Sequence, residues 1–433
     1  MHLINDINLL REIDEENKYY YNKEIKYIEN MLGQMTHISY ELYNCTKKID
    51  RKTKKDSVYT IIDKVKNMPN ITISAIIIAR NEEYLIERCI RSIEKCDFDE
   101  VIIIDTGSTD ETVNIVKRLV AKNQNLKFHI TKWNNNFSEI RNLGIELAKS
   151  QWVFFIDADE YYLKNNKYSI KEIISFYSIY NEGNLGICPT IINSTKHKLY
   201  NNPRIFRKDS GYLYYGNVHE MLRKKESEYR FIPNIGVNIT LEHDGYKEEI
   251  YIKKDKINRN INLLNMNIEE EPYNPLWRCY LVRDGFRNLN QDILVENCNI
   301  AIDLSKNKEE YFYKYNYFWA TSLLLDFYIQ NKNLKEARNL LNIIKNNDLE
   351  LDLTDIYYRE NLIDIMNIEY KLEEKLKSIK RFREKNLVTN GSLLNTEGLH
   401  IDELIMRLHY LNHNMYEFYE YKRALVESGY LKQ

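Results

Sequence analysis

Short apolar runs alternate with helical segments between residues 71 and 156, and this alternation constrains the fold more than any other feature. The predicted strands are residues 71–78, 101–104, 126–130 and 152–156. The predicted helices between them are residues 85–93, 110–121 and 137–149. Nearly continuous apolar runs rich in β-branched residues are typical of strands buried on both faces of a parallel sheet. The segment therefore indicates an α/β doubly wound sheet.

Helical segments are predicted on both sides of this sheet. Residues 1–70 form a helical extension in which Ile25, Ile28 and Met31 recur at helical spacing, and the pattern breaks at Met68-Pro69-Asn70. Residues 71–246 form the α/β domain. Its later part has a predicted helix at 169–180 and β-like runs near 185–192, 212–218 and 231–241.

Residues 247–433 are predicted to be entirely helical. The run at 331–347 resembles one arm of a helical-hairpin repeat, so we predict packing similar to that of tetratricopeptide repeats.

Charge and hydropathy exclude several classes of protein. The chain has 62 basic and 64 acidic residues and a net charge of -2, whereas a general nucleic-acid binder needs a basic excess. Its N-terminus carries charges where a signal peptide has an apolar run. Its longest apolar stretches are too short to span a bilayer. The six cysteines form no CxxC pair, which argues against a zinc knuckle or a redox motif. We therefore expect a cytoplasmic protein without a membrane span.

Three of the predicted strands end abruptly in polar residues. Residues 79–83 follow the first strand, residues 105–110 follow the second, and residues 157–160 follow the fourth. In open α/β sheets, ligands bind outside the carboxyl ends of the strands. Three polar ends at one edge predict a shared site for a polar ligand.

Asp157 and Asp159 carry the most specific chemistry at this edge. Extended residues at positions i and i+2 point to the same side, so the two carboxylates can bind one hard divalent cation, directly or through water, or contact a sugar hydroxyl. Mg²⁺ and Mn²⁺ prefer oxygen ligands and retain phosphate and water in their coordination shell. A second DxD, Asp97-Phe98-Asp99, precedes a strand and is not predicted to act in this way.

Two other polar groups at this edge leave more than one interpretation open. Ser108 and Glu111 fit a capping box that opens the next helix after a turn at Gly107, whereas Asp105 ends its strand, where it can accept a hydrogen bond from a pyrimidine imide. Arg141 is either an ion-paired arginine or a contact to a diphosphate or ribose, which its planar guanidinium suits.

The motifs taken together resemble those of the large inverting GT-A glycosyltransferase family 2. The resemblance covers residues 71–246 and is carried by AIIIARNEE, IIIDTGSTDET, FSEIRNLGIELAKSQWVFFIDADE, NVHE and LEHDGY. Within that family the layout is similar to bacteriocin S-glycosyltransferases of the sublancin and thurandacin type, which also have helical regions at both ends. The segment RNINLLNMNIEEEPYNPLW is similar to their post-catalytic helices.

The resemblance implies a GT-A fold, a Mg²⁺ or Mn²⁺ ion, and roles for individual residues. It places Ala79, Arg80 and Glu82 at the nucleotide base, Asp105 at uracil and Arg141 near the diphosphate or ribose. It makes Asp157 the donor-contacting carboxylate, also available to the metal, and Asp159 the principal metal carboxylate.

The acceptor half of the domain contains His219, Glu220 and His243. We predict Glu220 as the catalytic base, His243 as a third metal ligand, and His219 as a residue that orients either of them. The structural alternatives are a packed histidine and a carboxylate at the start of a helix. A base matters less for a cysteine acceptor, because a free thiol with a pKa of about 8.5 readily forms thiolate.

We therefore expect an inverting transferase that moves a hexose, glucose from UDP-glucose, to a cysteine or serine of a ribosomal antimicrobial peptide. The flanking helices would bind the bacteriocin precursor or form a homodimer. One alternative is a family 2 enzyme acting on a cell-surface glycan or a lipid-linked sugar. Another is a non-catalytic helical-repeat scaffold with a degenerate transferase domain. A dinucleotide-dependent oxidoreductase is not favoured, because no GxGxxG follows the first strand.

Overall fold

The computed structural model describes residues 22–39, 51–164, 166–179, 185–225, 229, 231–243, 256–346, 353–387 and 392–432. The chain forms two compact units, residues 1–290 with 307–313 and residues 291–306 with 314–433. Unit 1 thus includes two helices beyond residue 246. The domain boundaries expected at residues 70 and 246 stay predictions.

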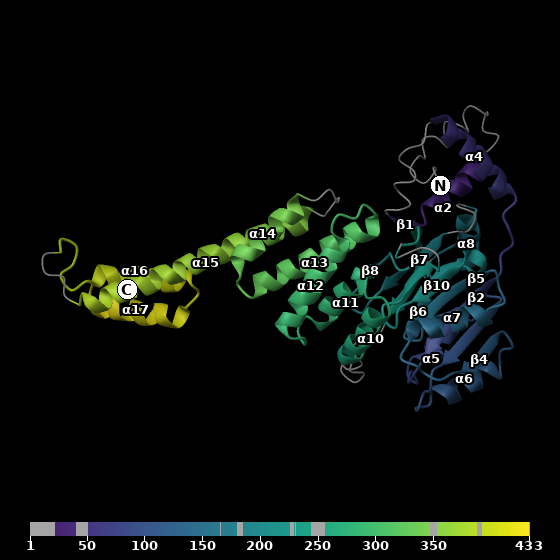
Figure 1. Cartoon of the computed structure of the whole chain (residues 1–433), viewed down its shortest axis with the longest axis horizontal. Coiled ribbons are helices and arrows are strands. Elements are labelled where there is room, and N and C mark those ends of the chain that lie inside the picture. Colours follow the sequence, from purple (N-terminus) through teal and green to yellow (C-terminus); the bar gives the residue numbers. More distant parts are fainter. Residues whose placement is uncertain are drawn as a thin grey trace. The chain divides into compact units, whose positions relative to one another are not determined.

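A mixed sheet forms the centre of unit 1 (Figure 1). Its strands are β1 (Met35–Ile38), β2 (Ile73–Ala79), β3 (Glu100–Asp105), β4 (Leu126–Ile130), β5 (Trp152–Asp157), β6 (Glu160–Leu163), β7 (Gly186–Ile192), β8 (Lys198–Leu199), β9 (Ile205–Arg207) and β12 (Asn234–His243). Their order is β1-β12-β7-β9-β5-β2-β3-β4, while β6 pairs with β12 and β8 with β7. The strands β10 (Tyr212–Tyr215) and β11 (Met221–Lys224) form a separate antiparallel hairpin.

The first four strands predicted from the sequence are present and parallel to one another. Alternate residues on them enter two separate hydrophobic clusters. Ile77 and Ile103 pack on one face of the sheet, and Ile76 and Ile102 pack on the other. Because both faces are buried, neither set of alternating positions is polar, which explains the continuous apolar runs in the sequence.

Helices cover both faces of the sheet. The helices of unit 1 are α2 (Asn22–Leu32), α4 (Arg51–Lys66), α5 (Ile86–Ile93), α6 (Thr112–Val120), α7 (Phe137–Leu147), α8 (Ile170–Ser178), α10 (Lys256–Glu270) and α11 (Pro275–Gly285). Residues of α2, α5, α6 and α8 enter one cluster, and residues of α7 enter the other. Gly144 lets α7 approach the sheet closely, since a Cβ there would lie 2.8 Å from Ile76 Cγ2.

The N-terminal region contributes a strand as well as helices. The predicted helical character is confirmed by α2 and α4, and Ile25, Ile28 and Met31 are buried. Between these helices, β1 pairs antiparallel with β12, which the sequence analysis missed. The strand is only four residues long and has no alternating pattern, so its partner is needed to define it. Residues 1–21 and 40–50 lie outside the described residues.

Unit 2 consists of helices in its described part. They are α12 (Gln291–Ser305), most of α13 (Tyr311–Gln330), α14 (Leu334–Lys345), α15 (Leu353–Lys385), α16 (Leu399–Leu411) and α17 (Met415–Glu427). Leu325, Leu341 and Ile363 belong to one of its small cores, and Ile379 and Ile405 belong to another. The predicted helical C-terminal region is confirmed, while a tetratricopeptide-like arrangement stays a prediction.

None of the helices in the described part of the chain is long and apolar enough to cross a membrane.

Candidate active site

The polar strand ends lie side by side at one edge of the sheet. Ala79 at the end of β2 is in register with Asp105 at the end of β3. On its other side, β2 pairs with β5 so that Ile78 is opposite Asp157. Parallel strands in this register bring Ala79, Asp105 and Asp157 to the same carboxyl edge, as the sequence pattern predicted.

Asp105 is buried and organises the loop that follows it. One carboxylate oxygen accepts the backbone N–H groups of Gly107 and Ser108, each at 2.9 Å, and the other accepts the Ser108 hydroxyl. The capping box predicted at Ser108 and Glu111 is wrong. Helix α6 begins at Thr112, its N-cap residue is Glu111, and the Glu111 side chain makes no capping hydrogen bond. The Ser108 hydroxyl donates to Asp105 and does not cap the helix. The expected turn at Gly107 is present, with φ of 95°.

The loop after β2 is joined to this second loop. Asn81 has a left-handed φ of 54°, its N–H donates to the Ser108 hydroxyl at 2.8 Å, and its side-chain oxygen accepts the Thr109 N–H at 2.8 Å. The Glu82 N–H donates to Thr112 Oγ1 at 2.8 Å, and Arg80 is exposed beside it. These contacts hold the two loops of the predicted nucleotide edge together.

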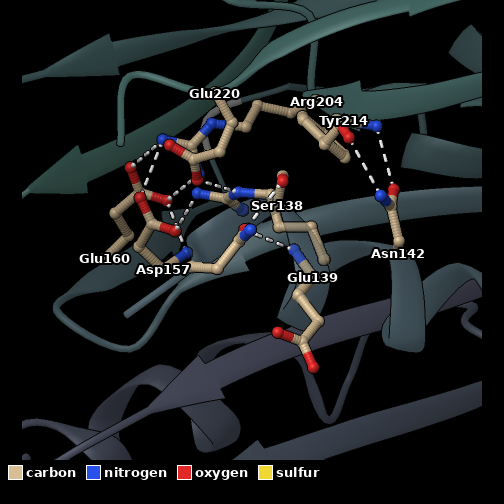
Figure 2. A network of polar contacts seen from close by, with 10 residues as sticks. Ser138, Glu139, Asn142, Asp157, Glu160, Arg204, Tyr214 and Glu220 are labelled. Atoms are coloured by element: carbon tan, nitrogen blue, oxygen red, sulfur yellow. Dashed lines mark hydrogen bonds and ion pairs between the residues drawn. The ribbon is translucent and has the colours of Figure 1, made fainter. Parts of the chain in front are cut away.

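Asp157 lies between two arginines. One of its oxygens is 3.2 Å from Arg141 Nη2. The other is 2.8 Å from Arg204 Nη2, and Figure 2 shows Arg204 beside Asp157. Burial alone would raise the pKa of Asp157, but the positive charges of Arg204 and Arg141 outweigh it and hold that pKa well below its ordinary value. Asp157 is therefore a carboxylate with a guanidinium on each oxygen.

Glu160 supports Arg204 from the other side. Its side chain is fully buried and lies 3.3 Å from Arg204 Nη2, and its second oxygen accepts the backbone N–H of Asp157 at 2.9 Å. Burial raises the pKa of Glu160 to about 8, against the lowering effect of Arg204 and with a further increase from the charge on Asp157. The charge on Asp157 is thus stabilised in preference to that on Glu160.

Arg141 connects Asp157 to the acceptor half of the domain. It projects from α7, whose N-terminus is capped by the Asn136 side chain, and its Nε donates to Glu220 Oε1 at 2.6 Å. Burial would lower the pKa of Arg141, but the charges of Glu220 and Asp157 more than offset it and raise that pKa. Carboxyl and guanidinium groups alternate in a continuous series formed by Glu160, Arg204, Asp157, Arg141 and Glu220.

Asp159 and His243 form a second polar pair beside this series. Strand β12 is antiparallel to β6, with His243 in register with Glu160, and His243 Nε2 lies 3.4 Å from Asp159 Oδ1. Two ligands of one Mg²⁺ or Mn²⁺ ion, each about 2.1 Å from the metal at right angles, are about 3 Å apart. A carboxylate and an imidazole at this spacing fit such an ion. Within the described ranges, no group of three or more His, Cys, Asp or Glu side chains is arranged to hold a metal.

The imidazole of His219 contacts helix α11. Its Nε2 lies 2.6 Å from Asp284 Oδ2 on α11, and its ring stacks on Tyr280 with centroids 4.5 Å apart. Burial would raise the pKa of Asp284, but the hydrogen bond and charge of His219, together with Arg283, lower it to about 2. His219 has a left-handed φ of 54° and joins the loop before β11 to helix α11.

A cavity of about 330 Å³ opens beside the loop that carries Glu220. It lies between the start of α7, the end of β10 and the helices α10 and α11. Its walls combine aromatic rings with carboxylates and amides, including Tyr214, Tyr215, Trp277, Glu139, Asn142 and Glu270. Asn142 exchanges two hydrogen bonds of 2.9 Å with the backbone of Tyr214, which fixes α7 against β10 (Figure 2).

Arg204, Glu160 and Asp284 are members of the site that were not predicted from the sequence. Arg204 comes just before the short strand β9 and meets Asp157 across 47 residues of sequence. Asp284 lies in α11, beyond residue 246, where the α/β domain is predicted to end. The only sequence signal among the three was the position of Glu160 directly after the DxD.

A comparison with known families decides the class of this site. The family model "Glycosyl transferase family 2" matches residues 74–226, which include the strand ends, Arg141, both DxD carboxylates and Glu220. Residues 74–226 form a family 2 glycosyltransferase domain, and the chain is a glycosyltransferase. The predicted family and GT-A fold class are confirmed for this transferase, and its activity as an enzyme follows from them.

Relatives of the transferase include one that matches most of its length. It is 29% identical over 360 residues to the SPbeta prophage-derived glycosyltransferase SunS of Bacillus subtilis, covering 81% of this chain and 80% of SunS. The lipopolysaccharide core biosynthesis glycosyltransferase LpsC of Rhizobium meliloti is 34% identical over 93 residues, which are 22% of this chain and 33% of LpsC. Residues 1–349 of S. aureus TarS align with 62% of this chain and 90% of that one, at 14% identity and a TM-score of 0.37.

Proposed function

We propose that the transferase moves a hexose from a UDP-sugar to a cysteine of a ribosomally made peptide. The proposed donor is UDP-glucose, and the transfer inverts the anomeric configuration. One observation carries the proposal. At the carboxyl edge of the sheet, Arg141 joins the donor-side carboxylate Asp157 to the acceptor-side carboxylate Glu220. An inverting displacement needs these two sides to meet across one anomeric carbon.

We assign the donor to the edge formed by Ala79, Asp105 and Asp157. The loop containing Arg80 and Glu82 would border the base, and Asp105 would accept the imide N–H with the lone pairs that its loop leaves free. Arg141 would contact the ribose or diphosphate with the guanidinium N–H groups that Glu220 and Asp157 do not use. Membership of family 2 supports a nucleotide-sugar donor in this position.

We assign the metal to Asp159 and His243, which are the pair whose spacing fits one ion. A Mg²⁺ or Mn²⁺ ion bound there would neutralise charge on the departing diphosphate. Asp157, also predicted as a ligand, is engaged by two guanidinium groups and would act on the donor through Arg141. His219 would position the loop that carries Glu220 through its contact with Asp284.

The acceptor assignment rests on similarity to SunS over 81% of the chain, which is more than the predicted α/β domain alone. The cavity beside the Glu220 loop would receive the residue next to the acceptor, since α10 and α11 contribute its outer wall. We further propose that the enzyme is cytoplasmic and that its helical regions, the tetratricopeptide-like part included, bind the peptide or form a homodimer.

The alternative acceptor is a cell-surface glycan or a lipid-linked sugar. It is favoured by the match to LpsC, although that match is limited to 93 residues. The third hypothesis, a scaffold with a degenerate transferase domain, is not supported, because the family match includes an intact set of carboxylates.

Mass spectrometry of the acceptor tests the proposal directly. We expect a cysteine-containing bacteriocin precursor, incubated with the enzyme, Mn²⁺ and a panel of UDP-sugars, to gain one hexose from UDP-glucose. The gain should survive alkaline conditions that remove O-linked sugars, and a peptide with serine in place of the cysteine should gain less. Transfer to a lipid-linked glycan with none to any peptide would reject the peptide acceptor.

Glu220→Gln should separate the two kinds of acceptor. If Glu220 is the base, the variant should lower kcat for a serine peptide by about 10²–10⁴-fold. The loss for the matching cysteine peptide should be smaller, because thiolate is already accessible near neutral pH. Both rates can be measured from UDP release with the two peptides. Equal losses would argue that Glu220 serves only to hold Arg141.

A further inference from the structure

Arg204 stands out among the buried charged groups because neither the family motifs nor the proposed donor and metal contacts give it a role. Its side chain is 8% exposed, and it lies within hydrogen-bonding distance of Asp157 and Glu160. Its backbone is held as well, since its N–H donates to Ile187 at 3.1 Å and its carbonyl accepts the Phe155 N–H at 2.9 Å. The guanidinium therefore reaches the DxD from a fixed point between β7 and β5.

The contacts of Arg204 form a closed ring with the first DxD carboxylate. Arg204 Nη2 donates to Asp157 Oδ2 at 2.8 Å and to Glu160 Oε1 at 3.3 Å. Glu160 Oε2 in turn accepts the backbone N–H of Asp157 at 2.9 Å. Arg204 thus holds the side chain of Asp157 and Glu160 holds its backbone, as Figure 2 shows at the strand end.

We propose that Arg204 is a positioning residue that turns Asp157 toward Arg141. The two carboxylates of the DxD then have separate tasks. Asp159 faces His243 at 3.4 Å, and Asp157 presents its remaining oxygen to Arg141 at 3.2 Å. Without Arg204, one oxygen of Asp157 loses its partner, and the carboxylate is free to rotate away from Arg141.

This inference deepens the proposed function and rests on it, because Arg204 acts only through Asp157. A simpler explanation is that Arg204 neutralises the buried Glu160, which needs a positive partner in any buried site. The two explanations differ in what happens when the charge on Glu160 is removed. Glu160→Gln keeps an oxygen that can accept the Asp157 N–H and abolishes the need for neutralisation, while Arg204 still holds Asp157.

The test is therefore made in the Glu160→Gln background. UDP release from UDP-glucose with Mn²⁺ gives kcat and KM for Glu160→Gln alone and for the double variant that also carries Arg204→Met. We expect kcat of the double variant to be about 10–100-fold lower, the range seen when a residue that orients a functional ligand is lost. KM for UDP-glucose and the melting temperature should change little, since we assign no donor contact to Arg204.

Arg207→Met provides the matched control, because Arg207 is the last residue of β9, the strand that Arg204 precedes, and pairs with Asp209 at the surface. It should retain the activity of its background. Equal kcat values for Glu160→Gln and the double variant would show that Arg204 only balances Glu160 and would overturn the inference. A double variant that no longer folds would overturn it as well, because Arg204 would then be structural. Absence of UDP release from the wild-type enzyme would instead reject the proposed function.

Discussion

Asp159→Asn is expected to reduce sugar transfer by about 10³-fold while the protein stays folded. The substitution keeps the shape of the side chain but removes the charge that would attract a divalent cation beside His243. The Asp159 side chain is 15% exposed, and its only ion-pair partner in the described part of the chain is His243, so little folding energy depends on it. UDP release with Mn²⁺ measures the loss, and thermal unfolding checks the fold.

The sequence contains its own control for this experiment. Asp97 begins the second DxD, is exposed, and precedes a strand, so Asp97→Asn should leave activity unchanged. Binding of Mn²⁺ in the presence of UDP, followed by electron paramagnetic resonance, should weaken in Asp159→Asn and not in Asp97→Asn. Full activity in Asp159→Asn would reject the metal assignment.

Arg141→Met is expected to reduce both activity and stability. Glu220, with a side chain 12% exposed, loses its guanidinium partner, and Asp157 retains only Arg204. Removing one partner of such a pair leaves a partly buried charge uncompensated, which should lower the free energy of unfolding by about 3 kcal/mol. We expect kcat to fall by about 10²-fold or more, since Arg141 is the link between donor and acceptor sides. Denaturant unfolding and UDP release measure the two effects.

A second substitution separates these two effects. Glu220→Gln added to Arg141→Met removes the uncompensated charge and should restore most of the stability, but not the activity. As a control, Arg91→Met removes an exposed arginine that pairs with Glu87 on α5, and it should change neither quantity by much. If the double variant regained activity together with stability, Arg141 would be a structural residue and would have no part in the reaction.

The central sheet could be predicted from the sequence because both faces of its strands are buried. Burial on two sides leaves runs such as residues 152–156 without polar interruptions, and the first polar residue then marks the end of the strand. Parallel strands have their carboxyl ends at the same edge of a sheet, so the meeting of Asp105 and Asp157 at one edge was also predictable. Strand β1 could not be predicted, because its four residues show no alternating pattern and form a strand by pairing with β12.

The sequence by itself determined the α/β core, the positions of its strand ends and the identity of the carboxylates gathered there. These are local consequences of hydrophobic pattern and strand direction. Only the tertiary structure decided which partner each of those side chains has. Arg204, Glu220 and His243 come from separate segments, and each pairs with a residue 47 or more positions away, at a place where little water can screen its charge. No local pattern records such pairs, because the energy that selects them exists only once the segments have packed together.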